Sequence, residues 1–120
     1  MTLMAKILVV DDSWVARLGM NRLLVSLGHD VIEAHGGAQA LDILAQVIPD
    51  AVFLDLLMPD LDGLGVLEAL KSRKSTVPVF VVSADIQDTT VQRCLELGAR
   101  QCLPKPPTRA GLQASLGTLQ

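Results

Sequence analysis

Five polar side chains each come just after a short apolar run of the sequence. They are Asp11, Asp12, Asp55, Ser83 and Lys105. Three carboxylates in one place repel one another, which raises their pKa values unless a cation lies among them. Oxygen ligands of this kind favour Mg²⁺, which prefers one or two carboxylates together with a phosphate. The residue types therefore predict a magnesium site at which a carboxylate attacks phosphorus.

The remaining two side chains suit the same chemistry. Lys105 would neutralise a carboxylate and later a phosphoryl oxygen, and Ser83 would donate a hydrogen bond to another oxygen. Taken singly, each residue has a simpler explanation. Asp12 would cap the first helix, Ser83 would cap the fourth, and Lys105 would be a solvated surface charge. Their joint occurrence at four strand ends favours a single site.

Apolar runs and helical periodicity define the elements that would position these residues. The first, third and fourth runs are nearly continuous and aliphatic, which is typical of strands buried on both faces of a parallel sheet. We expect strands over Ile7–Val10, His29–Ala34, Ala51–Leu54, Val77–Val82 and Arg100–Leu103. The intervening segments place apolar residues at helical spacing. We expect helices over Ser13–Leu27, Ala38–Val47, Leu64–Lys74, Asp85–Leu97 and Thr108–Leu119.

Some helix ends have specific signals. Gly28 and Gly98 stand where left-handed residues commonly end a helix, and Asp62 is a suitable N-cap for the third helix. In the fourth helix, the spacing predicts that Val91, Cys94 and Leu95 face the core.

Strand and helix alternate five times, which predicts an α/β fold with a parallel sheet and right-handed crossovers. Helices would cover both faces of the sheet. The carboxyl ends of parallel strands meet at one edge, where open α/β sheets bind their ligands. We therefore expect the five polar side chains to meet there. With 120 residues and no linker or repeat, the chain is expected to form one domain over residues 1–120.

Composition argues against several classes of function. The net charge is −3, the pI is about 5.1 and Lys and Arg do not cluster, so nucleic acid and anionic membranes are not expected partners. No apolar run is long enough to span a bilayer, and residues 1–6 lack the pattern of a secretory signal. Cys94 and Cys102 lack a CxxC spacing and are expected to be reduced. We expect a cytoplasmic protein.

Four motifs in this order carry a resemblance to a known family. They are Ile7–Ser13, Asp55–Gly63, Val82–Ala84 and Lys105–Pro106. Together they resemble the receiver domains of two-component response regulators over essentially the whole chain, in particular the single-domain, chemotaxis-regulator-like type. The resemblance implies a flavodoxin-like, doubly wound sheet of five strands in the order 2-1-3-4-5, with five helices.

The resemblance also implies roles for the site residues. Asp55 is implied as the phosphoacceptor, Ser83 as the hydroxyl that moves to meet the phosphoryl group, and Lys105 as its bridging cation, with a cis bond to Pro106. The implied protein ligands of Mg²⁺ are the carboxylates of Asp11, Asp12 and Asp55 and the backbone carbonyl of Leu57.

The same resemblance implies a phosphorelay partner. A sensor histidine kinase or a histidine phosphotransferase would supply the phosphoryl group, and phosphorylation would switch binding to a downstream protein or an attached output domain. No turnover of an external substrate is expected. Trp14 at the start of the first helix is a candidate anchor for the donor protein. Cys102 occupies a position where many receivers carry Tyr or Phe, so the aromatic half of the usual switch is missing.

Two other functions fit part of the pattern. A pseudo-receiver would be an interaction module that takes no phosphoryl group, and the complete acidic set argues against it. A phosphatase of the haloacid-dehalogenase type also uses an Asp nucleophile and Mg²⁺. That type needs a DxD pair on the first strand, whereas Asp11 and Asp12 are adjacent and the candidate nucleophile, Asp55, follows the third strand.

Overall fold

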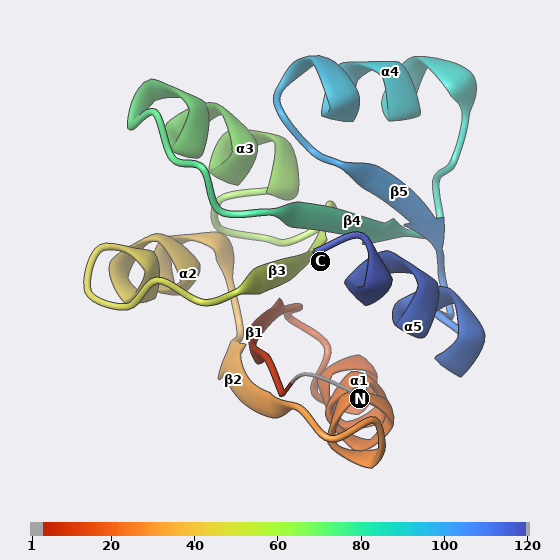
Figure 1. The fold of residues 1–120 in the computed structure, drawn as a ribbon. Coiled ribbons are helices and arrows are strands. Elements are labelled where there is room, and N and C mark those ends of the chain that lie inside the picture. Colours follow the sequence, from red (N-terminus) through yellow and green to blue (C-terminus); the bar gives the residue numbers. More distant parts are fainter. Residues whose placement is uncertain (1–3, 120) are drawn as a thin grey trace.

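A five-stranded parallel sheet with helices on both faces makes up the protein (Figure 1). The computed structural model describes residues 4–119. The strands are β1 (Lys6–Val10), β2 (Asp30–Ala34), β3 (Ala51–Asp55), β4 (Val79–Ser83) and β5 (Gln101–Pro104). The helices are α1 (Trp14–Ser26), α2 (Gly37–Leu44), α3 (Gly63–Ser72), α4 (Asp88–Glu96) and α5 (Arg109–Gly117). The strand order is β2-β1-β3-β4-β5, so the predicted fold is confirmed.

The sheet divides the apolar core into two halves. Alternate residues of β1, β3 and β4 face opposite sides, which is the two-residue period of a strand. One side packs against α1 and α5, where Phe53 and Phe80 stack with their ring centroids 5.3 Å apart. The other side packs against α2, α3 and α4. Figure 1 shows this division, with α1 and α5 together on one face. Two-sided burial explains why these strands are aliphatic throughout.

The strand register brings the predicted site residues to one edge. Val10 is paired with Leu54, so Asp11 and Asp55 are the next residues on adjacent strands. Asp55 is in turn paired with Val82, one residue before Ser83. Since all these strands run in parallel, their carboxyl ends open onto the same edge, as the sequence predicted.

The caps of α1 and α3 come from side chains of their own loops. Ser13 is the N-cap of α1, and its hydroxyl accepts a hydrogen bond from the Ala16 N–H at 3.2 Å. The alternative that Asp12 caps this helix is therefore wrong. Asp62 caps α3 as predicted, accepting from the Gly65 N–H at 2.8 Å.

Gly28 and Gly98 have the left-handed conformation expected of them. Their φ angles are 92° and 104°, immediately after the C-caps of α1 and α4. A side chain at either position would strain the backbone, so glycine is the residue suited to these turns.

Helix α4 begins later than predicted, and α2 ends earlier, at Leu44 rather than Val47. Helix α4 begins at Asp88 rather than Asp85, because the preceding residues form a hydrogen-bonded loop. The Ser83 hydroxyl accepts from the Asp85 N–H at 3.0 Å, and the Asp85 carboxylate accepts from the Gln87 N–H at 3.2 Å. Gln87 is the N-cap, so the alternative that Ser83 caps this helix is also wrong.

The inward face of α4 was predicted correctly in part, and Val91 is half-buried. Cys94 is fully buried, but the Leu95 side chain is 47% exposed. The buried stripe instead continues from Cys94 to Leu97, three residues on. Leu95 was thus wrongly assigned to the core, because an i, i+3 step and an i, i+4 step both fit helical spacing.

Gly63, the first residue of α3, lets the helix approach the end of β3. Its N–H donates to the Leu56 carbonyl at 2.9 Å. A Cβ atom at this position would lie 2.5 Å from the Asp55 carbonyl oxygen and 2.8 Å from the Leu56 Cα. Both are backbone atoms, which cannot move aside without displacing the strand end that carries Asp55.

Gly63→Ala should therefore lower the free energy of unfolding by at least about 1–3 kcal/mol, the usual range for overpacking. Gly19→Ala in α1 is the matched control, because nothing lies within 4 Å of the added Cβ. That change should raise the free energy of unfolding by roughly 0.5–1 kcal/mol through helix propensity. Urea unfolding of both variants measures the difference. Equal stability of Gly63→Ala and the parent would show that the close approach is not required.

Candidate functional site

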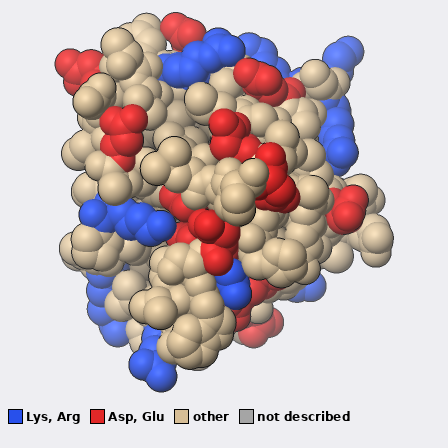
Figure 2. Space-filling model, turned by 180° about the vertical axis from the view of Figure 1, so that it is seen from behind, with Lys and Arg blue, Asp and Glu red and all other residues tan. Residues whose placement is uncertain are grey.

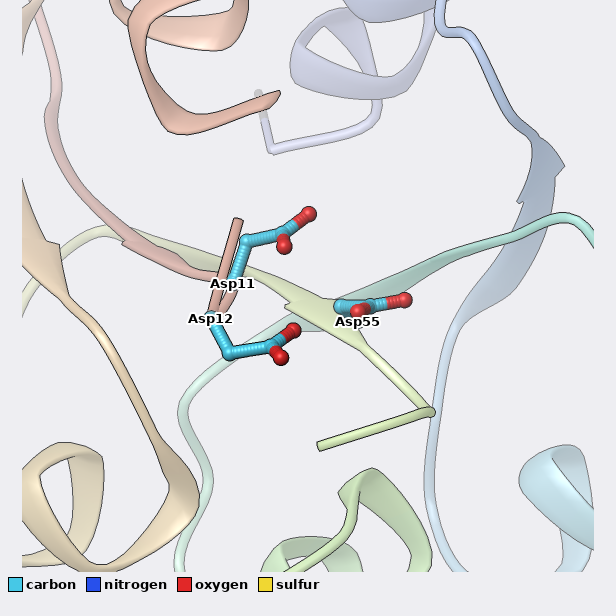
Figure 3. Close-up of side chains that lie close together, drawn as sticks. All are labelled: Asp11, Asp12 and Asp55. Atoms are coloured by element: carbon cyan, nitrogen blue, oxygen red, sulfur yellow. The ribbon is translucent and has the colours of Figure 1, made fainter. Parts of the chain in front are cut away.

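Three carboxylates meet at the carboxyl edge of the sheet. One oxygen from each of Asp11, Asp12 and Asp55 lies within 4.8 Å of the others. Asp11 and Asp12 follow β1 and Asp55 ends β3, and Figure 3 shows their side chains projecting to the same side of the strand ends. Asp11 and Asp55 are buried, whereas Asp12 is exposed. All three carboxylates predicted to bind a metal ion are thus brought together.

Asp11 is fixed on every side by hydrogen bonds. Its N–H donates to the Ala34 carbonyl of β2 at 3.1 Å. One carboxylate oxygen accepts from the Ser13 N–H at 2.8 Å, and the other accepts from Lys105 Nζ at 2.7 Å. Among residues 4–119, in contrast, no group donates a hydrogen bond to the Asp12 carboxylate. Asp12 is therefore the carboxylate most available to a ligand.

Lys105 brings a positive charge between two of the carboxylates. Its Nζ lies 2.7 Å from Asp11 Oδ2 and 3.6 Å from Asp55 Oδ1. Burial lowers the pKa of Lys105, but the hydrogen bond and the negative charge of Asp11, together with Asp55, outweigh it and leave the pKa raised. The predicted cis bond joins Lys105 to Pro106. The side chain is therefore held at the site as an ammonium ion.

One ammonium ion does not compensate for three carboxylates. Burial raises the pKa of Asp55 above its usual value, and the charge of Asp11 raises it further, while Lys105 acts in the opposite direction. The raised pKa shows that the negative charge on Asp55 is still disfavoured. A divalent cation would relieve it, and an all-oxygen donor set with one exposed carboxylate suits a hydrated Mg²⁺. The residues present therefore fit a magnesium ion.

Ser83 and Leu57 lie at the same edge of the sheet, and the backbone N–H of Leu57 donates a hydrogen bond to the Asp55 carboxylate. Ser83 is 1% exposed, and its hydroxyl accepts a hydrogen bond within its own loop, from the Asp85 N–H. Leu57 follows β3 by two residues and its side chain is 72% exposed. The backbone carbonyl of Leu57 as a metal ligand stays a prediction.

Asp60 supports the site in a way that the sequence did not reveal. Helix α2 has no cap from its own N-cap residue, Gly36. The Asp60 carboxylate of the β3–α3 loop instead accepts from the Gly37 and Ala38 N–H groups at 3.4 and 3.2 Å. The backbone N–H of Leu61, and then that of Ala38, lower the pKa of Asp60. The loop that follows Asp55 is thereby tied to α2.

Comparison with known families identifies the protein class. The family model of the response regulator receiver domain matches residues 7–116 of the chain. The chain belongs to this family. The receiver domain predicted from the four sequence motifs is thereby confirmed, and receiver domains are typically signal-transduction modules rather than enzymes.

Curated relatives carry such a domain within longer proteins. The sensory/regulatory protein RpfC of Xanthomonas campestris is 37% identical over 118 residues, which cover 95% of this chain and 16% of RpfC. The response regulator MprA of Mycobacterium avium is 43% identical over 103 residues, which cover 84% of this chain and 44% of MprA. This receiver domain thus spans less than half of the length of either relative.

Solved receiver domains have the same architecture. The Francisella response regulator 1452 receiver domain superposes with a TM-score of 0.90 at 27% identity, covering 96% of this chain and 95% of that one. The Vibrio cholerae chemotaxis protein CheY4 superposes with a TM-score of 0.89 at 26% identity, covering 98% of this chain and all of CheY4. The likeness to CheY4 agrees with the chemotaxis-regulator-like type predicted from the sequence.

Surface charge and helix hydropathy add two observations on this receiver domain. On the face shown in Figure 2, acidic side chains gather near the middle and Lys and Arg lie mainly toward its edges. That face does not present the continuous basic stripe that commonly binds nucleic acid. Within residues 4–119, no helix has both the length and the hydropathy required to cross a bilayer.

Asp60→Asn should destabilise the receiver domain in a pH-dependent way. A pKa below the unfolded value means that the stabilisation is present above the unfolded pKa and is lost as the pH falls through the folded pKa. The variant should be less stable than the parent near pH 7. The difference should narrow as the pH falls below about 4, where Asp normally protonates, and should disappear only below the lowered pKa of Asp60. Urea unfolding across this pH range measures the gap.

Asp42→Asn is the control for that series, because Asp42 is an exposed carboxylate of the same helix, α2. It removes the same charge without removing the cap. If Asp42→Asn and Asp60→Asn followed the same pH curve, net charge rather than capping would explain the effect.

Proposed function

We propose that the receiver domain accepts a phosphoryl group on Asp55 and thereby switches its binding to a partner protein. The observation that carries the proposal is the buried Asp55 carboxylate, which lies 3.6 Å from Lys105 and within 4.8 Å of two other carboxylates. A carboxylate with a raised pKa, in reach of a cation and metal ligands, has the attributes of a nucleophile toward phosphorus.

The proposed metal ligands are the carboxylates of Asp11, Asp12 and Asp55 and the backbone carbonyl of Leu57. Mg²⁺ bound there would offset negative charge on the carboxylates and on the transferring group. Asp12 is exposed and, among residues 4–119, its carboxylate accepts no hydrogen bond, so it is the ligand most available to the ion. Asp11, with both oxygens already engaged, would act mainly through water.

The transfer would combine Asp55, Lys105 and Ser83 of this chain with a phosphohistidine of the donor protein and the bound Mg²⁺. A carboxylate oxygen of Asp55 forms a bond to phosphorus while the bond from phosphorus to the donor's histidine nitrogen breaks. The electron pair of that bond leaves with the imidazole. Lys105 already lies beside Asp55 and would pair with a phosphoryl oxygen. The Ser83 hydroxyl would turn to donate to another phosphoryl oxygen.

If the phosphoryl group stays on Asp55, the phosphorylated protein is itself the product of the reaction. We therefore expect slow self-dephosphorylation but no turnover of an external substrate. The donor would be a sensor histidine kinase or a histidine phosphotransferase, which implies a cytoplasmic site of action. The target of the signal would be a downstream protein or an attached output domain.

Apolar side chains around the site offer a surface for the donor protein. The Trp14 and Val15 side chains of α1 are 66% and 69% exposed. Leu57 and Ile86, in the loops after β3 and β4, are 72% and 50% exposed. Exposed Trp beside a reactive group is a residue type that often anchors interfaces.

Intact-mass spectrometry after incubation with acetyl phosphate tests the phosphoacceptor. We expect the parent to gain one phosphoryl group in the presence of Mg²⁺ and none after chelation. Asp55→Asn should gain none under either condition, because the amide is not a nucleophile toward phosphorus. A folded parent that gains no phosphoryl group from acetyl phosphate or from a kinase would instead favour the interaction module without phosphorylation.

Trp14→Ala should slow transfer from a cognate phosphotransferase by about tenfold, the effect of losing one interface anchor. Phosphorylation by acetyl phosphate should stay at the parent rate, because a small donor needs no docking surface. Val25→Ala is the control, since Val25 is 54% exposed on the same helix, about 16 Å along its axis from Trp14. Equal slowing with both donors would assign Trp14 to the site itself.

A further inference from the structure

A half-buried arginine holds the peptide that carries two of the proposed metal ligands. Arg17 lies on the first turns of α1, and its side chain is only 14% exposed. Its Nη1 donates to the backbone carbonyl of Asp11 at 2.7 Å. That carbonyl belongs to the peptide group joining Asp11 to Asp12. A short, charge-assisted hydrogen bond therefore fixes the plane of this peptide.

The guanidinium is itself held from the other side. Its Nε donates to a Glu33 carboxylate oxygen at 3.3 Å, and Glu33 belongs to the edge strand β2. The second oxygen of Glu33 accepts from Asn21 Nδ2 of α1 at 3.1 Å. Both oxygens of Glu33 are thus used, and the fork of Arg17 joins β2 to the end of β1.

Among residues 4–119, no hydrogen bond supports the Asp12 side chain as Ser13 and Lys105 support that of Asp11. The Asp11 side chain is set by Ser13 and Lys105, which act on its two carboxylate oxygens. The Asp12 carboxylate is exposed, and within the described part of the chain no hydrogen bond orients it. Its direction therefore follows from the peptide plane before it, which Arg17 fixes.

We propose that Arg17 is a positioning residue for the metal site, which aims Asp12 by holding the Asp11–Asp12 peptide. The proposal rests on the magnesium site of the proposed function. For removal of Arg17, the positioning role and simple electrostatics predict opposite changes in the affinity for Mg²⁺. A cation near three carboxylates weakens binding of a second cation, so removing its charge alone would strengthen Mg²⁺ binding. Loss of positioning would weaken it.

The charge of Glu33 makes the electrostatic effect small. Glu33 lies against the guanidinium and offsets its charge at longer range, so the acidic cluster experiences the pair rather than the arginine alone. Outer partners of metal ligands typically contribute 10- to 100-fold to metal affinity through orientation. Positioning should therefore dominate.

Titration with Mg²⁺, followed by the fluorescence of Trp14, tests the proposal. Trp14 is the sole tryptophan and stands two residues after Asp12. Arg17→Gln should weaken Mg²⁺ binding by about 10-fold or more. Arg17→Lys keeps the charge without the fork and should recover only part of the affinity. Arg22→Gln removes the same charge from an exposed position of α1 and should bind as the parent does.

A second readout needs no metal. In amide NMR spectra of metal-free protein, Arg17→Gln should shift the Asp12 and Ser13 resonances, whereas Arg22→Gln should leave them in place. Affinity in Arg17→Gln equal to the parent's or higher would overturn the positioning role and leave the metal site intact. A parent that binds no Mg²⁺ would instead overturn the metal site. If Arg17→Gln does not fold, Arg17→Lys and Glu33→Gln decide by the same comparison.

Discussion

Repulsion among three carboxylates is the constraint on which the arrangement of this protein depends. A parallel sheet brings Asp11 and Asp55 together because their strands are paired in register and end at the same edge. The fold must then hold negative charges that would otherwise separate. Lys105 does so from the position just after β5, and its hydrogen bond to Asp11 joins residues that are 94 positions apart in the sequence. The remaining excess of negative charge favours binding of a cation.

Holding such a site requires that the loops around it be fixed from several sides. Gly63 lets α3 pack directly on the end of β3, and Asp60 ties the same loop to α2. Arg17 does the equivalent on the β1 side by joining the Asp11 carbonyl to Glu33. In each case a close contact or a hydrogen bond involving the backbone fixes a loop that follows one of the carboxylate-bearing strands. Stability and site geometry are therefore determined by the same contacts.

The sequence predicted what depends on local pattern. Aliphatic runs gave the five strands, helical spacing gave the five helices, and the residues after the strands gave the acidic edge with Lys105. It failed where a choice depends on distant partners. Asp60 caps a helix that begins 23 residues before it. The one local signal for this cap was a helix start at Gly36 and Gly37 without a polar side chain.

The same contacts indicate how phosphorylation of Asp55 would change the structure at the protein surface. Ser83 is buried, and its hydroxyl accepts a hydrogen bond from the Asp85 N–H. The Asp85 carboxylate in turn accepts from the Gln87 N–H and the Thr90 hydroxyl, which orders the start of α4. A hydroxyl that turned toward Asp55 would release that N–H and loosen the loop before α4. Cys102, at the usual aromatic position, packs against the core beside Cys94, so no ring can rotate there. The change would therefore be transmitted through the loop and α4, rather than through a side chain of β5.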